Sequence, residues 1–383
     1  MSVFISGTGL FTPNEYITNE ELVESFNSYV EFYNKENQES ISTGEMEALV
    51  LSSSEFIKKA SGIERRYVQD KAGILDISRM RPKLKERKND ELSILAEMAV
   101  AASKQALDQA NTNASEIDAV ICGCSNLQRA YPAIAIEVQQ ELGIEGYAYD
   151  MNVACSSATF SIQNAFNDIK AGVADKILVV NPEICSGHLN FRDRDAHFIF
   201  GDACTAVILE RQQDSSFSFE ILGTQLQTKF SNNIRNNFGF LNSPEDSDPN
   251  SSDKLFIQKG RSVFKEVVPI VQMHISDHLN ELNLEISEIK RLWLHQANLS
   301  MNLLIAKKLL GRDPDENEMP IILNDYANTS SAGSIIAFHQ YKDDFKSDEK
   351  GVISSFGAGY SVGSVIVRTV SYTHLTLPTS PKV

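Results

Sequence analysis

Residues 154–158 of the chain read ACSSA and residues 328–332 read NTSSA, and this echo is the most informative feature of the sequence. Each string lies downstream of a Ser-Glu-Ile tripeptide: Ser115 precedes Cys155 by 40 residues, and Ser287 precedes Asn328 by 41. Matching strings at matching distances indicate that one helix–strand unit occurs twice, with a site between the two copies.

A third pair of strings follows in the same order, FGDACTAVILE at 200–210 and FGAGYSVGSVIVR at 356–368. Short apolar strands alternate with amphipathic helices through most of the chain, which is typical of an α/β protein. Residues 90–110 show the helical spacing well, and Asp90 can cap this helix. A strand is expected to follow at 117–124.

The composition excludes several classes of protein. The 35 Lys+Arg against 51 Asp+Glu give a net charge of −16, which argues against a nucleic-acid partner. No run of about 18 apolar residues is present, so we expect no membrane span, and the first residues lack the pattern of a secretory signal. Five cysteines without a CxxC pair are typical of reduced thiols in the cytoplasm, not of a zinc site or a disulfide framework.

The repeats divide the chain into an N-terminal half, residues 1–215, and a C-terminal half, residues 216–370. Two polar segments, at about 19–52 and 69–89, are expected as insertions in the first half. Residues 371–383 fit neither the repeat nor a regular period, so they are interpreted as a non-native extension, or else as a disordered terminus.

Three residues near the repeated strings could carry chemistry. Cys155 is expected on a strand-to-helix turn, where the helix macrodipole would lower the thiol pKa and favour nucleophilic attack on a thioester; a buried, inert cysteine is the alternative. His295 follows a strand directly, where α/β sites usually lie, although a lone histidine is more often structural. Asn328 could be a helix N-cap or a donor to an oxyanion.

Taken together, these residues and their surrounding motifs resemble the β-ketoacyl-acyl-carrier-protein synthase III family of the thiolase-like superfamily, over about residues 1–370. The motifs that carry the resemblance are ACSSATF around Cys155, HQAN from His295, ANTSSAG around Asn328, IFGDACTAVIL from Ile199 and FGAGYSVGSVIVR from Phe356. The resemblance implies a duplicated βαβαβαββ fold arranged in five layers, αβαβα.

The resemblance also implies an activity, in which Cys155, His295 and Asn328 form a Cys–His–Asn triad. The reaction would be a decarboxylative Claisen condensation of an acyl group held on Cys155 with malonyl-acyl-carrier-protein, in fatty acid biosynthesis. The backbone N–H groups of Cys155 and Gly359 would form the oxyanion hole. The family works as a homodimer and requires no metal or redox cofactor.

Departures from the family pattern leave the acyl donor open. At the donor mouth, Phe56 stands in the place of a tryptophan that stacks on coenzyme A, Ala60 in the place of an arginine, and Ser300 in the place of a second arginine. Tyr131 matches an aromatic residue at the end of the acyl pocket. Short-chain acyl-coenzyme A, medium-chain donors and donors on a carrier protein all remain open.

An acidic enzyme needs a local basic rim to attract acyl carrier protein, which is itself acidic. Lys265, Lys307 and Lys308 match docking positions of the family. A basic run in the 69–89 segment, before the first repeat, could add to the rim or could be a solvated loop; it comprises Arg79, Arg81, Lys83, Lys85, Arg87 and Lys88.

Two other functions are compatible with the same motifs. One is a ketosynthase of secondary metabolism, of the pyrone- or resorcinol-forming type, that uses medium or long acyl donors. The other is a non-catalytic partner subunit of a heterodimer. The intact set Cys155, His295 and Asn328 argues against the non-catalytic alternative.

Overall fold

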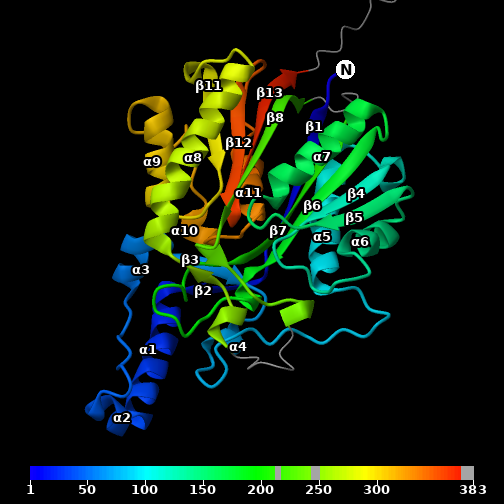
Figure 1. Cartoon of the computed structure of the whole chain (residues 1–383). Coiled ribbons are helices and arrows are strands. Elements are labelled where there is room, and N and C mark those ends of the chain that lie inside the picture. The colour runs from blue at the N-terminus through cyan, green and yellow to red at the C-terminus, as the bar shows by residue number, and fades with distance from the viewer. Residues whose placement is uncertain (212–216, 243–250, 372–383) are drawn as a thin grey trace, which may run out of the picture.

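The computed structural model describes residues 1–211, 217–242 and 251–371 of the chain (Figure 1). The division that the repeats place at residue 215 falls within 212–216, outside the described residues. Residues 372–383 of the expected tail also lie outside them, whereas Ser371 ends the last strand.

The N-terminal half contains a βαβαβαββ unit, as the resemblance implied. Its elements are β1 (Phe4–Phe11), α5 (Ile94–Ala110), β4 (Ala119–Gly123), α6 (Ile134–Leu142), β5 (Tyr147–Met151), α7 (Ser157–Ala171), β6 (Lys176–Ile184) and β7 (Asp202–Glu210). The helix expected from Asp90 begins at Ile94 instead, because the Ser93 hydroxyl caps it by accepting a bond from Ala96 N–H (3.1 Å).

The C-terminal half repeats this order with one difference. Its elements are β8 (Phe217–Ser231), α8 (Gly260–Glu281), β11 (Ile289–Leu294), α9 (Leu299–Leu310), α10 (Leu323–Tyr326), α11 (Ala332–Gln340), β12 (Lys350–Gly357) and β13 (Gly359–Ser371). All residues between α9 and α11 are described, and they form the short helix α10 but no strand. The second copy therefore lacks the counterpart of β5.

The order of the strands shows the duplication directly. One nine-stranded sheet runs β11-β12-β13-β8-β1-β7-β6-β4-β5. The two halves meet where β1 pairs with β8, with Phe4 opposite Glu220 and Ile5 opposite Phe219. From this junction outward, each half presents its first strand, then its last, then its last but one, and then its second. The order in which the strands pair is therefore repeated in the two halves, as the sequence strings are.

Helices cover both halves in layers (Figure 1). The two helices α7 and α11 contact strands of both halves, so they form a central layer. The helices α5 and α6 pack on the outer face of the N-terminal strands, and α8 and α9 pack on the outer face of the C-terminal strands. This is the five-layer αβαβα arrangement, and it places the N-termini of α7 and α11 between the two halves.

Smaller elements surround one end of the layers. These are β2 (Glu15–Thr18), α1 (Asn19–Glu36), α2 (Gln38–Thr43), α3 (Ser54–Ser61), β3 (Arg65–Val68), α4 (Lys71–Leu75), β9 (Ile234–Arg235) and β10 (Ile257–Gln258). In Figure 1, α1 and α2 project from the body of the molecule. The chain returns along α1, where the Asn27 side chain exchanges two hydrogen bonds with the backbone of Ser52 (3.1 and 2.8 Å).

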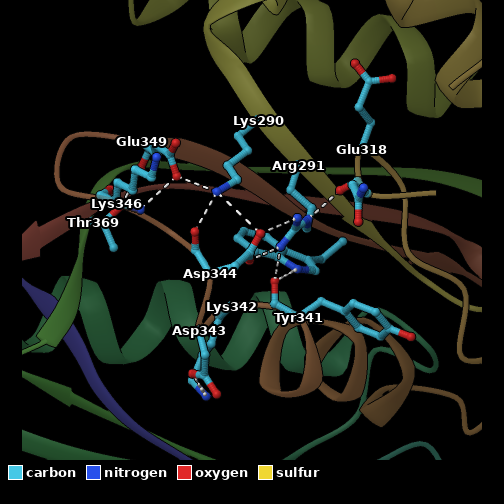
Figure 2. A network of polar contacts seen from close by, with 12 residues as sticks. Lys290, Arg291, Glu318, Tyr341, Lys342, Asp343, Asp344, Lys346, Glu349 and Thr369 are labelled. Carbon is cyan, nitrogen blue, oxygen red and sulfur yellow. Dashed lines mark hydrogen bonds and ion pairs between the residues drawn. The ribbon is translucent and has the colours of Figure 1, made fainter. Parts of the chain in front are cut away.

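A polar network around the buried Arg291 holds β11, the strand that leads to His295 (Figure 2). Arg291 is 3% exposed and donates to both carboxylate oxygens of Asp344 (2.5 and 2.9 Å) and to the Tyr341 carbonyl. Lys290 Nζ lies 3.4 Å from the same carboxylate. Because a buried guanidinium is stable only when its donors are satisfied, this bidentate pair fixes the strand against the loop after α11.

Candidate active site

Cys155 lies where the sequence placed it, on the turn between β5 and α7. The helix begins at Ser157 with Ser156 as its N-cap residue and ends at Gly172 in the left-handed conformation. Ala154, just before the cysteine, has φ of 47°, a value that an alanine adopts only when its surroundings hold it there. The turn therefore presents the thiol at the N-terminus of α7.

The sulfur of Cys155 is surrounded by hydrogen-bond donors. The Ser330 hydroxyl lies 3.4 Å from Sγ, and the backbone N–H groups of Cys155 and Ala358 also interact with it. The thiol pKa is nevertheless raised to about 11, chiefly by burial and also by the negative charge of Glu183. The expectation that the helix macrodipole lowers this pKa is thus wrong, because desolvation outweighs the donors.

His295 follows β11 and is 2% exposed. Its backbone N–H donates to the Ser354 carbonyl (2.8 Å), and its own carbonyl accepts a bond from the Asn302 side chain (3.0 Å). The imidazole packs edge-on against Phe356, with ring centres 5.2 Å apart. Burial lowers the pKa of His295 to about 3, so near neutral pH the ring is uncharged and carries one N–H donor.

Asn328 is held by the loop of the IFGD motif from the other half of the molecule. Its N–H donates to the Ile199 carbonyl (3.0 Å), and its carbonyl accepts from Gly201 N–H (3.1 Å). The side-chain oxygen accepts from Ser330 N–H (2.8 Å), which leaves the amide NH₂ as a donor. Since Ser331 is the N-cap residue of α11, Asn328 is not a helix cap.

The structure brings Cys155, His295 and Asn328 to the wall of one cavity of about 580 Å³. Phe356 and Gly357 complete the wall around the thiol. The cavity thus holds one nucleophile and several neutral hydrogen-bond donors, from the imidazole, the amide side chain and the backbone. Such a set can stabilise negative charge that develops on a carbonyl oxygen.

The three residues assigned to the donor mouth, Phe56, Ala60 and Ser300, line the same cavity. The Phe56 ring lies edge-on to Phe198 and under the guanidinium of Arg194, 4.0 Å from the ring centre. Arg194 is not among the residues predicted from the sequence. The signal that could have revealed it is the charged string RDRD, residues 192–195, which lies three residues before the IFGD motif.

Gly359 and Tyr131 are the two remaining residues predicted near the site. The backbone N–H of Ala358, on the turn between β12 and β13, interacts with the Cys155 sulfur, and the oxyanion-hole role of the Gly359 N–H stays a prediction. Tyr131 is 84% exposed and does not line the cavity, because it lies on the loop between β4 and α6. Within this chain it cannot close the acyl pocket.

The lysines expected to dock a carrier protein lie in two places. Lys265 lines the cavity from α8, whereas Lys307 and Lys308 are exposed in the last turn of α9. Lys83 and Lys85, from the basic run, line a second hollow of about 290 Å³ that shares no lining residue with the main cavity. None of the six residues of the run lines the main cavity.

The described residues offer neither a metal-binding cluster nor a membrane-spanning helix. Within 1–211, 217–242 and 251–371, no group of three or more His, Cys, Asp or Glu side chains could hold a metal ion. In the same part of the chain, no helix is long and apolar enough to span a membrane.

Comparisons with known proteins agree with this architecture. Residues 149–229 match the family described as 3-oxoacyl-[acyl-carrier-protein] synthase III, and residues 279–369 match its C-terminal part. A β-ketodecanoyl-[acyl-carrier-protein] synthase from Pseudomonas aeruginosa is 62% identical over 90% of this chain and 99% of its own length. A β-ketoacyl-[acyl-carrier-protein] synthase III from Methylococcus capsulatus is 28% identical over 95% and 98%.

Among solved structures, a 3-oxoacyl-[acyl-carrier-protein] synthase III from Aquifex aeolicus superposes with a TM-score of 0.75 over 96% of this chain and 99% of its own. At 24% identity this likeness supports the fold alone. The relative at 62% identity supports membership of the family as well as the fold, because it aligns over nearly the whole of both chains. The chain belongs to the β-ketoacyl-[acyl-carrier-protein] synthase III family and is an acyltransferase of that type.

Proposed function

We propose that the protein condenses a medium-chain acyl group, held as a thioester on Cys155, with malonyl-acyl-carrier-protein. The observation that carries the proposal is the single cavity wall that combines Cys155, His295 and Asn328 with two backbone N–H groups at the sulfur. The chain length follows from the relative at 62% identity, which is named for a β-ketodecanoyl product. The malonyl group contributes two carbons after it loses CO₂, so a ten-carbon product requires an eight-carbon acyl donor.

In the first half-reaction, the Cys155 sulfur attacks the carbonyl carbon of the acyl thioester. The N–H groups of Cys155 and Ala358 stabilise the oxyanion of the tetrahedral intermediate. The bond to the donor sulfur then breaks, and the donor leaves as a thiol with the proton that Cys155 gave up. The high thiol pKa means that this proton is lost during the attack and not beforehand.

In the second half-reaction, the malonyl thioester loses CO₂ and becomes an enolate. The His295 N–H and the Asn328 NH₂ donate hydrogen bonds to the enolate oxygen, and a neutral imidazole suits this role because it donates without having to be charged. The enolate carbon attacks the acyl carbonyl and forms the new C–C bond. The bond to the Cys155 sulfur breaks, and the β-ketoacyl thioester leaves on the carrier.

The proposal is tested by intact mass measurement after incubation with octanoyl-coenzyme A, octanoyl-carrier protein or acetyl-coenzyme A. We expect an octanoyl adduct on the wild-type protein, and a ten-carbon β-ketoacyl product once malonyl-carrier protein is added. The two octanoyl donors distinguish coenzyme A from carrier protein as the source of the acyl group.

The matched control is Cys155→Ala, which should form no adduct with any donor. An acetyl adduct in place of the octanoyl adduct would contradict the proposed chain length. The absence of an adduct from every donor would contradict the proposed mechanism itself.

We further propose that the protein works as a homodimer in the cytoplasm. The strand β5 forms one edge of the sheet, and a long unprotected edge is usually paired or covered. The exposed Tyr131 would contribute to an acyl pocket only across such an interface. All five cysteines are free, which supports a reducing compartment.

A further inference from the structure

Glu183, near the end of β6, is a fully buried carboxylate outside the expected triad. It takes part in none of the ion pairs of the described residues; instead, two serines hold it. Ser125 donates from its N–H (3.0 Å) and its hydroxyl (2.6 Å), and Ser331 donates from its N–H (3.2 Å) and its hydroxyl. Burying a carboxylate without a cation beside it costs free energy. The four hydrogen bonds from neutral serine groups offset this cost, so we look for a role that requires the carboxylate at this place.

The two serines belong to different halves of the molecule. Ser125 follows β4 in the N-terminal half, whereas Ser331 caps α11 in the C-terminal half. Glu183 therefore joins the two repeats across the central layer, at the level of the Cys155 turn. The thiols of Cys124 and Cys185, each 3.9 Å from the carboxylate, complete its surroundings.

Ser330, the residue directly before Ser331, contacts both Cys155 and Asn328. Ser330 donates from its hydroxyl to the Cys155 sulfur (3.4 Å) and from its N–H to the Asn328 side chain (2.8 Å). Ser330 also has φ of 50°, a conformation that persists in a serine only when neighbouring contacts over-determine it. The two hydrogen bonds from Ser331 to Glu183 supply such a constraint one residue away.

We infer that Glu183 is a positioning residue for the condensation. Through Ser331 it holds Ser330 in the conformation that orients the Asn328 amide and contacts the Cys155 sulfur, and through Ser125 it ties this loop to the N-terminal half. The inference rests on the proposed function, because the geometry it protects is that of the condensing site.

The charge of Glu183 also acts on the Cys155 thiol. This second effect can be measured separately, so it distinguishes a positioning role from a general effect on the stability of the protein. The carboxylate raises the pKa of the Cys155 thiol. In Glu183→Gln the charge is lost, and the new NH₂ group faces serine N–H donors where an acceptor is needed. The variant should therefore form the Cys155 thiolate at lower pH and yet condense more slowly, since small displacements of reacting groups are costly.

The test measures two quantities on the full-length protein. The pH profile of Cys155 alkylation by iodoacetamide reports on the thiolate, and kcat and KM with octanoyl-coenzyme A and malonyl-carrier protein report on condensation. For Glu183→Gln we expect an alkylation midpoint at lower pH, a kcat reduced about tenfold to a hundredfold and a KM within about threefold of wild type.

Ser331→Ala separates the two effects, because it removes the hydroxyl link and keeps the carboxylate. We expect a lower kcat here too, without a shift of the alkylation midpoint to lower pH. If Glu183→Gln does not fold, this variant decides the question alone. Asp150→Asn is the matched control: Asp150 also accepts two backbone N–H bonds, from Ile134 and Ala135 (2.8 Å each), but it holds no residue of the 328–331 string.

An unchanged kcat in Ser331→Ala, or in a folded Glu183→Gln, would overturn the inference. So would an equal loss of kcat in Asp150→Asn, since the effect would then not be specific to Glu183. Failure of the proposed function looks different. In that case the wild-type protein makes no ten-carbon product, while the alkylation profiles still report whether Glu183 acts on Cys155.

Discussion

Individual small residues make room for the chemistry of this site. A Cβ atom added to Gly357 would lie 2.6 Å from Cys155 Cβ and 3.1 Å from its sulfur, so only glycine fits beside the nucleophile. Ala154 and Ala327 have φ of 47° and 55°, and each precedes the functional residue of its repeat, Cys155 or Asn328. The duplication thus extends to backbone conformation, which a comparison of sequence strings does not reveal.

At the residue scale, we predict that Gly357→Ala blocks acylation of Cys155. The added methyl group must displace the cysteine, because both groups lie on backbone held by the sheet and by α7. We expect octanoyl transfer to slow by about a hundredfold, the cost of an ångström-scale displacement, as measured by the rate of mass increase. Gly239→Ala is the control, since no atom lies within 4 Å of its added Cβ. Equal rates in both variants would contradict the prediction.

At the scale of elements, α9 connects the cavity to the surface. Its N-cap residue Asn298 lines the cavity and caps the helix through Met301 N–H (3.3 Å), and its last turn carries Lys307 and Lys308. Lys307 is paired with Asp313 (2.9 Å), an exposed pair that costs little to break. The helix α9 therefore holds Lys307 and Lys308, at its C-terminal end, at a fixed distance from the cavity.

We predict that Lys307→Glu combined with Lys308→Glu weakens the use of carrier-protein substrates. Reversing two positive charges removes attraction to an acidic partner, and in low salt we expect KM for malonyl-carrier protein to rise about threefold to tenfold. Acylation from octanoyl-coenzyme A should not change. Lys104→Glu, an exposed charge reversal on α5, is the control. An equal loss with both kinds of carrier would refute a docking role.

At the scale of the whole molecule, the six histidines of the described residues are buried or partly buried, and they are uncharged near neutral pH. Burial lowers the pKa of all six histidines in the described residues, to about 4 for His188, His278 and His339 and to about 3 for His197 and His295, with His274 also lowered. The unfolded chain binds protons at these groups below about pH 6.5, whereas the folded chain does not. Their contribution to stability is therefore complete above pH 6.5 and is lost as the pH falls towards 4.

We predict that the melting temperature falls steadily between pH 7 and pH 5. Four buried carboxyl groups act in the opposite direction, because burial raises their pKa and the folded state then gains a proton: Asp202, raised to about 6, and Asp150, Glu183 and Asp193. The six histidines outnumber them. Thermal unfolding followed by circular dichroism at several pH values measures the effect. In His278→Asn, which can keep a hydrogen bond to Ser364, the slope should be smaller; an unchanged melting temperature from pH 7 to pH 5 would contradict the argument.

The order of the elements and the identity of the candidate residues could be predicted from the sequence. Helical and strand periods are local, and the paired strings around Cys155 and Asn328 reveal the duplication without any coordinates. The start of α5 was missed by four residues because Ser93 and Asp90 are both good caps, and packing selects between them. The missing counterpart of β5 was not predicted either: β11 is an edge strand of the sheet, yet residues 311–322 form no strand beside it.

The sequence by itself therefore determined the duplicated α/β fold, the family and the residues of the candidate site. Tertiary structure decided their chemical state: the high pKa of the Cys155 thiol, the neutral His295 ring, the approach of Ala358 N–H and the contacts of Glu183 with both halves. The physical reason is that burial, electric fields and hydrogen-bond partners come from residues distant in the chain. A local pattern of residues carries no information about them until the two repeats pack together.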